Sequence, residues 1–142
     1  MRSWVVAGCA GSAAALLALA LAGQIAGGVA VVLPATVALG FFNGMFAVAA
    51  IGSMMALAGE GREEREGTRM GLWGASQAIA AGAGGLFGAA AVDLARHLTD
   101  TASAFGLVFI FEAGIFAASA WMAAHIIETR SQPKLGRMVP GE

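Results

Sequence analysis

The stretch Gly61-Arg-Glu-Glu-Arg-Glu-Gly-Thr-Arg-Met-Gly-Leu-Trp-Gly74 decides the fold, because it is densely charged in the middle of an apolar chain. The 142 residues are 58% hydrophobic and only 12% charged. An ordinary soluble domain carries about 25% charged residues. A charge at the centre of a bilayer is costly, so this stretch is expected to lie in water between membrane-spanning helices.

Four apolar segments surround the charged stretch, and each is long enough for the roughly 20 helical residues that a bilayer core requires. The sequence therefore predicts an all-α, polytopic membrane protein with a transmembrane domain over residues 1–127 and a polar cytoplasmic tail over 128–142. The predicted helices cover residues 4–22, 30–58, 70–94 and 102–127. The apolar runs are continuous rather than alternating, which excludes β-barrel strands.

Turn and cap residues separate the predicted helices. Gly27 and Gly28 divide the first two, and Pro34 is expected in the opening turn of the second, where proline is tolerated. Short polar side chains often cap helix starts, so Thr68 is a candidate cap for the third helix. Thr99, Asp100 and Thr101 are candidates for the fourth.

The distribution of basic residues predicts the orientation in the membrane. Four spans place both termini and the loop 59–69 on one side, and that side should carry most Lys and Arg if it is cytoplasmic. Seven of the eight basic residues fall there, and Arg96 alone falls on the other side. The seven are Arg2, Arg62, Arg65, Arg69, Arg130, Lys134 and Arg137.

Small residues spaced four apart mark candidate helix-packing faces, because they let another helix backbone approach closely. The predicted second helix has Gly40 and Gly44, and the third has Gly74, Gly82 and Gly85. The third is so rich in small residues that we expect it to lie between other helices. The alternatives are general helix packing and a dedicated dimer face.

Polar residues inside the predicted spans are the candidate ligand-binding residues. Glu112 is the foremost, because an acid at membrane depth is a functional candidate by default. Its roles could be proton carrier, ligand of a pigment's metal, or a protonated partner of a neighbouring helix. Gln77 and Asn43 could ligate a magnesium porphyrin or bridge helices, and His125 could ligate magnesium or lie at the interface beside Trp121.

Several protein classes are excluded by what the sequence lacks. It has no HExxH, paired CxxC, P-loop or GxSxG motif, so we expect no catalytic residues and no metal site of its own. The single Cys9 forms no disulfide framework, and no basic patch suits nucleic acid. Asp93, Arg96, His97 and Asp100 are expected to form a solvated cluster in a short loop.

One long run resembles a known family. The run Gly67-Thr-Arg-Met-Gly-Leu-Trp-Gly-Ala-Ser-Gln-Ala-Ile-Ala80, continuing through Gly82-Ala-Gly-Gly-Leu-Phe-Gly88 to Val92-Asp-Leu-Ala-Arg96, resembles the PucC-like, bacteriochlorophyll-delivery branch of the major facilitator superfamily. The resemblance implies that the chain corresponds to the last four helices of a longer facilitator fold. It also implies bacteriochlorophyll as cofactor and an inner, intracytoplasmic photosynthetic membrane as location.

Three functions follow as expectations. The resemblance favours an assembly protein of light-harvesting complexes that associates with antenna helices and the reaction centre. A stoichiometric structural subunit of a reaction centre–light-harvesting complex is the second. The third is a fragment of a small-molecule transporter, in which Glu112 would couple proton movement to transport.

Overall fold

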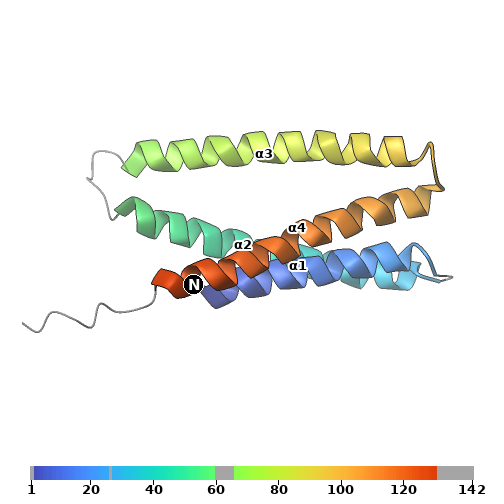
Figure 1. Cartoon of the computed structure of the whole chain (residues 1–142), viewed down its shortest axis with the longest axis horizontal. Helices are drawn as coiled ribbons and strands as arrows, with labels where there is room; N and C mark the ends of the chain where they lie inside the picture. The colour runs from blue at the N-terminus through green and yellow to red at the C-terminus, as the bar shows by residue number, and fades with distance from the viewer. Residues whose placement is uncertain (1, 26, 60–65, 131–142) are drawn as a thin grey trace, which may run out of the picture.

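The computed structural model describes residues 2–25, 27–59 and 66–130, and the regular elements in this part of the chain are all helices (Figure 1). Its helices are α1 (Arg2–Ala22), α2 (Val29–Gly59), α3 (Glu66–Ala95) and α4 (Thr101–Arg130). All four are long and apolar enough to cross a membrane. The predicted all-α fold with four spanning helices is therefore confirmed.

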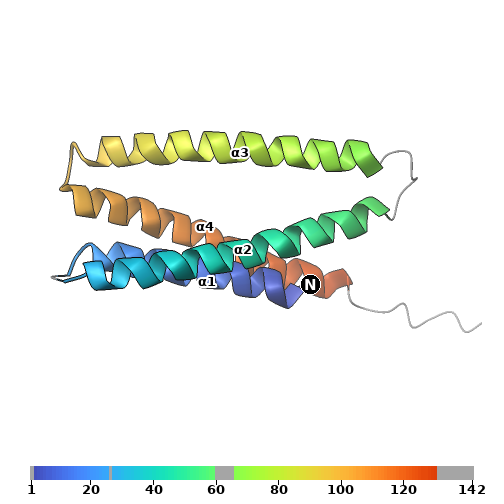
Figure 2. The ribbon, with the colours of Figure 1, turned by 180° about the vertical axis from the view of Figure 1, so that it is seen from behind.

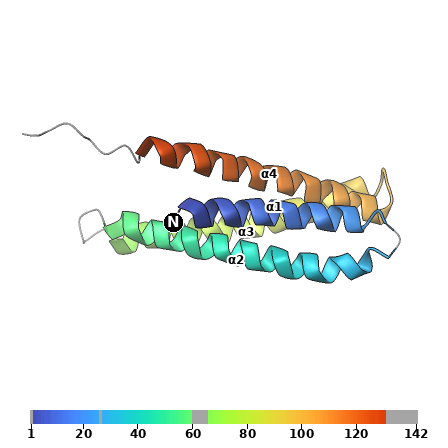
Figure 3. The ribbon, with the colours of Figure 1, turned by 90° about the horizontal axis from the view of Figure 1, so that it is seen from below.

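Helix α1 is the centre of the packed part of the molecule and lies between α2 and α4 (Figure 3). Its side chains Ala13 and Leu16 form the core cluster together with Ala113 of α4. Leu39 of α2 and Phe109 of α4 pack against this cluster. Most of the buried residues of the described chain belong to α1, which is why this short helix holds the other two together.

Two glycines of α1 set the close approach to α2. A Cβ atom at Gly8 would lie 2.9 Å from both the Cβ and the backbone nitrogen of Phe46. A Cβ at Gly11 would overlap the ring of Phe42. Only a residue without a side chain fits at these two positions, so the α2 backbone approaches α1 closely at Gly8 and the Phe42 ring packs on the α1 backbone at Gly11.

Helix α3 stands apart from the other three helices (Figures 1 and 2). Leu86 and Phe87 at its middle each keep 76% of their surface exposed. The expectation that this small-residue helix lies between other helices is wrong within the chain, because α1 holds that place. The glycines of α3 face few bulky side chains that could interlock with them, as Phe42 and Phe46 do with α1.

The two tight turns lie at the same end of the molecule, opposite the end of α2 and the start of α3 (Figures 1 and 2). In the first, Gly27 adopts φ +82°, which favours glycine, and a Cβ at Gly28 would overlap the carbonyl oxygen of Ala22. In the second, Asp100 caps α4: its carboxylate accepts hydrogen bonds from the backbone N–H of Ser103 at 3.1 Å and from its hydroxyl at 2.7 Å.

Three local expectations need correction. Helix α3 begins at Glu66, so Thr68 lies within its first turn and is not the cap. Helix α2 begins at Val29, within the predicted range for its start, and Pro34 therefore lies in its second turn and not in its opening turn. Helix α4 continues to Arg130, past residue 128 where the tail was expected. The rest of that tail, and residues 60–65 of the charged loop, lie outside the described residues.

Candidate functional site

Glu112 lies deep within the span of α4, eleven residues after its start at Thr101. At 1.5 Å of rise per residue this corresponds to about 16 Å along the helix, near the middle of a bilayer core. Its side chain is half-buried and lines two adjoining hollows between α3 and α4. Glu112 is therefore a carboxyl group at membrane depth with space beside it.

The first hollow, which we call the polar hollow, has a volume of about 460 Å³. Its walls are the glycine-rich face of α3 and the Phe105–Phe109 side of α4, and it reaches Asp93 and Arg96 at the end of α3. The second, the apolar hollow, has a volume of about 600 Å³ and is lined by Phe87, Leu107, Phe111 and Ile115 among others. Small-molecule sites in proteins span roughly 300–1,000 Å³, so both hollows are of suitable size.

The two hollows meet along a glycine seam, formed by Gly84 and Gly88 of α3 with Val108 and Glu112 of α4. All four residues line both hollows. A Cβ at either glycine would meet no atom within 4 Å, so the α3 side of the seam is open. A flat molecule could therefore lie against this backbone with its face near Glu112.

The mouth of the polar hollow carries charge. Arg96 Nη1 lies 3.9 Å from Asp93 Oδ1, and the two side chains are 51% and 76% exposed. Exposed pairs of this length contribute about 0–1 kcal/mol. The pair can therefore separate at little cost, and the expected solvated cluster turns out to border the same hollow as Glu112.

The other candidate ligand residues are not brought to this site. Asn43 and Gln77 are exposed on α2 and α3 and line neither hollow. His125 lies near the end of α4, where its Nδ1 is 2.9 Å from the carbonyl oxygen of Trp121 and the two rings are 4.5 Å apart. That contact agrees with the interfacial alternative for His125, and ligand roles for these three residues stay predictions.

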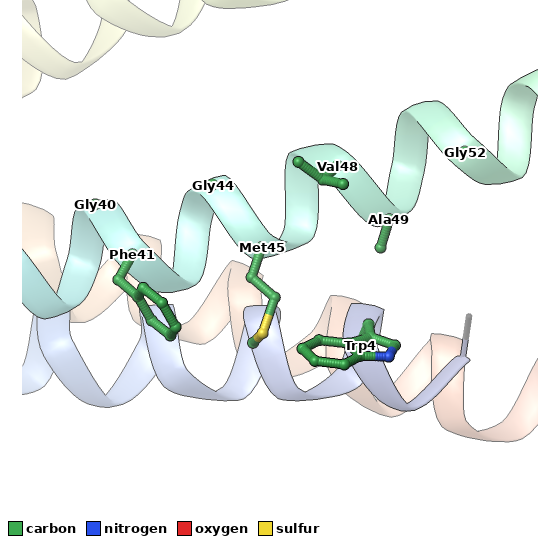
Figure 4. Close-up of a pocket in the computed structure, with 8 residues that line it drawn as sticks. All are labelled: Trp4, Gly40, Phe41, Gly44, Met45, Val48, Ala49 and Gly52. Atoms are coloured by element: carbon green, nitrogen blue, oxygen red, sulfur yellow. The ribbon is translucent and has the colours of Figure 1, made fainter.

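The candidate packing glycines lie on open helix faces. Gly40 and Gly44, with Gly52, line a groove of about 750 Å³ along α2 (Figure 4). Phe41 and Met45 of α2 and Trp4 of α1 border it, and its lining contains no charged side chain. A Cβ at Gly40, Gly44, Gly74, Gly82 or Gly85 would meet nothing within 4 Å. Their role as packing residues stays a prediction about partners outside the described chain.

Several polar side chains in the spans satisfy their hydrogen bonds locally. The hydroxyls of Thr36, Ser53, Ser76 and Ser119 each donate to the carbonyl oxygen four residues earlier, at 2.8–2.9 Å. These residues need no further partner at membrane depth.

Sequence reasoning did not identify Gly8 as a packing residue, and it did not place Arg96 at a ligand-sized hollow, because both depend on how helices face one another.

Comparison with known proteins finds one family and one relative that match nearly the whole chain. The family described as PUCC protein matches residues 1–131. The chain belongs to the PUCC protein family. It is also 56% identical, over all 142 of its residues, to the "Bacteriochlorophyll synthase 44.5 kDa chain" of Rhodobacter capsulatus. The chain spans 33% of that relative's length. No solved structure matches it.

Family membership and the four spanning helices make this a membrane protein of a photosynthetic, bacteriochlorophyll-related family. The residues at the glycine seam fit a pigment of that class. A carboxylate oxygen is a ligand that Mg²⁺ prefers, and the surrounding walls are apolar and partly aromatic. Glu112 would hold the metal, and the open glycine backbone would face the ring.

Proposed function

We propose that this chain is a membrane accessory protein that assembles bacterial light-harvesting complexes by holding bacteriochlorophyll and contacting antenna helices. The observation that carries the proposal is the position of Glu112, a carboxyl group at membrane depth between two ligand-sized hollows. Membership of the PUCC protein family and the printed name of the Rhodobacter capsulatus relative support a pigment of the bacteriochlorophyll class.

The role proposed for the chain is binding rather than catalysis. Glu112 would supply an oxygen ligand to the magnesium, and the apolar walls would exclude water from the ring. The groove along α2 would receive an antenna helix, because Gly40 and Gly44 let a second helix approach closely and the lining carries no charge. The pigment and the helix would thus lie on different faces of the same protein.

The orientation is part of the proposal. The helix ends that carry Arg2, Arg69 and Arg130 lie toward one end of the molecule, and Arg96 lies at the other (Figures 1 and 2). The bias of basic residues would put the first end, with both termini and the loop 59–69, in the cytoplasm of an intracytoplasmic photosynthetic membrane. Labelling of single cysteines at residues 69 and 96 in sealed vesicles tests this orientation.

The experiment that tests the proposal is purification of the chain in mild detergent from a phototrophic host, followed by an absorption spectrum and identification of co-purifying chains. We expect a bacteriochlorophyll band and antenna polypeptides with the wild-type protein. Glu112→Leu should reduce the pigment, and Ser119→Ala on the same helix is the control, because the Ser119 hydroxyl already donates to the Ile115 carbonyl oxygen. Purification with neither pigment nor antenna chains would refute the proposal.

A second candidate function is a permanent subunit of a reaction centre–light-harvesting complex. The exposure of α3 favours it, because a glycine-rich helix with open faces is suited to lie between helices of other subunits. The two functions differ in timing. A constant stoichiometric amount in mature complexes would favour the subunit, and presence only during assembly would favour the accessory protein.

Catalysis is tested separately, because the relative's printed name contains the word synthase. We propose that the chain itself is not an enzyme, since its sequence contains no HExxH, paired CxxC, P-loop or GxSxG motif. Incubation with a magnesium chlorin acid and an activated long-chain alcohol should give no ester. Formation of ester above the background of a mock preparation would contradict this part of the proposal.

A further inference from the structure

The polar hollow joins two chemically different groups at its two ends. Glu112 lies at membrane depth, and Arg96 lies beyond the last residue of α3, where the chain turns toward α4. Gly88 lines the hollow beside Glu112, and the eight residues from Gly88 to Arg96 correspond to about 12 Å along a helix. The hollow therefore places a carboxyl group and a guanidinium group roughly one small flat ligand apart.

The walls between these groups favour a flat apolar ring. On one side the α3 face has glycines 84, 85 and 88, whose open backbone presents no side chain. On the other side Phe105 and Phe109 lie with ring centroids 6.2 Å apart. Ala89 and Val92 complete the α3 wall with small or apolar side chains. A slot with one glycine-rich wall and one aromatic wall suits a planar conjugated molecule better than a lipid chain, since aromatic faces pack well against flat rings.

Arg96 could make the polar hollow specific for a ligand that carries a carboxylate. Among the residues that the structure describes, Arg96 carries the only positively charged side chain that lines the polar hollow, and its contact with Asp93 is long and exposed. A carboxylate on a ligand could instead accept two parallel hydrogen bonds from this guanidinium, which is the stronger arrangement. The other titratable groups near this end are Asp93, His97 and Asp100, and the Asp100 carboxylate is already bonded to Ser103.

We infer that the polar hollow selects a magnesium tetrapyrrole that still carries a free carboxylic acid, with the metal at Glu112 and the acid at Arg96. The inference rests on the proposed function and adds the substrate class to it. An esterified pigment would have no negative charge to place at Arg96 and would need to put its long chain past the charged mouth. The acid form would thus bind more tightly than the esterified form, which keeps the metal contact at Glu112 and lacks the contact with Arg96.

The experiment is a fluorescence titration of the purified full chain in lipid nanodiscs with two probes. The probes are a magnesium chlorin acid and the same chlorin esterified with a long-chain alcohol. We expect the wild-type chain to bind the acid about fivefold more tightly, the ratio that corresponds to roughly 1 kcal/mol for an exposed charge contact. Arg96→Gln should remove this preference by weakening binding of the acid alone.

Two further variants give effects of opposite sign. Asp93→Asn removes the carboxylate that competes for Arg96, so it should strengthen binding of the acid and leave the ester unchanged. Glu112→Leu should weaken both probes, because it removes the oxygen that would ligate the metal they share. Arg69→Gln, at the other end of α3, is the matched control and should change neither affinity.

The outcomes separate this inference from the proposed function. Equal binding of acid and ester, with no effect of Arg96→Gln on their ratio, would overturn the acid preference and leave pigment binding intact. Absence of binding by either probe would overturn both. Weaker binding of acid and ester to the same extent in Arg96→Gln would show a general effect on the hollow and would also overturn the inference. Circular dichroism of each variant checks that the helices are retained.

Discussion

Replacement of Gly8 by alanine should destabilise the protein, although alanine is the better helix former. A Cβ at this position would lie 2.9 Å from the backbone nitrogen of Phe46 and 3.0 Å from the carbonyl oxygen of Phe42. Carbon atoms pack best at about 3.5–4.0 Å, so α1 and α2 would have to separate by roughly half an ångström or more. Backbone atoms cannot rotate away as a side chain would.

The change in the free energy of unfolding of Gly8→Ala follows from two opposing effects. Overpacking a fitted interface costs about 1–3 kcal/mol. Alanine in place of glycine stabilises a helix by roughly 0.5–1 kcal/mol. We therefore expect Gly8→Ala to lower the free energy of unfolding by about 1–2 kcal/mol, from the difference between these effects.

Gly44→Ala is the matched control, because it makes the same chemical change where a Cβ meets nothing within 4 Å. It should leave the free energy of unfolding unchanged or raise it slightly. Both variants are measured by denaturant titration in mild detergent, with helical circular dichroism as the signal. Equal shifts in the two variants would refute the packing of α1 against α2 described above.

Three further predictions follow from other parts of the structure. Gly28→Ala should lower the thermal midpoint, because its Cβ would overlap the Ala22 carbonyl, whereas Gly71→Ala, in open space, should not. The pKa of Asp100 is lowered from its ordinary 3.8 by hydrogen bonds from the Ser103 hydroxyl and, next, from the Ser103 backbone N–H, so the ionised cap should stabilise α4 fully above pH 3.8 and lose this effect as the pH falls through the lower folded pKa. The difference in thermal midpoint between wild type and Asp100→Ala should therefore shrink in that acid range. A difference that does not depend on pH would contradict the cap. Gly44→Leu should fill the α2 groove and reduce co-purification of antenna chains without lowering the unfolding free energy, and unchanged co-purification would remove that groove as their docking site.

The spans and turns could be predicted from the sequence because they depend on local chemistry. Continuous apolar runs fix the helices, and the Gly27-Gly28 pair and Asp100 supply a turn and a cap that act on neighbouring residues. Glu112 could be singled out for the same reason, since an acid within an apolar run is visible without any neighbour.

The arrangement of the helices could not be predicted, because it depends on pairs of faces. Small residues recur every four positions in both α1 and α3, so spacing alone does not show which helix is central. What distinguishes α1 from α3 is the helix that packs against it: Phe42 and Phe46 of α2 lie against Gly8 and Gly11 of α1. Likewise, Arg96 shares a hollow with Glu112 only through the rotation of α3 relative to α4.

The separation of α3 from the other helices has a mechanical consequence. Lipid tails are as apolar as the side chains they would replace, so swinging this helix sideways in the bilayer forfeits few packed contacts and exposes no surface to water. The backbone N–H groups of Leu98 and Thr99 donate to the Ala95 carbonyl oxygen, and these bonds fix the end of α3 that adjoins α4. Sideways displacement of the rest of α3 is therefore expected to cost less packing free energy than displacement of α1.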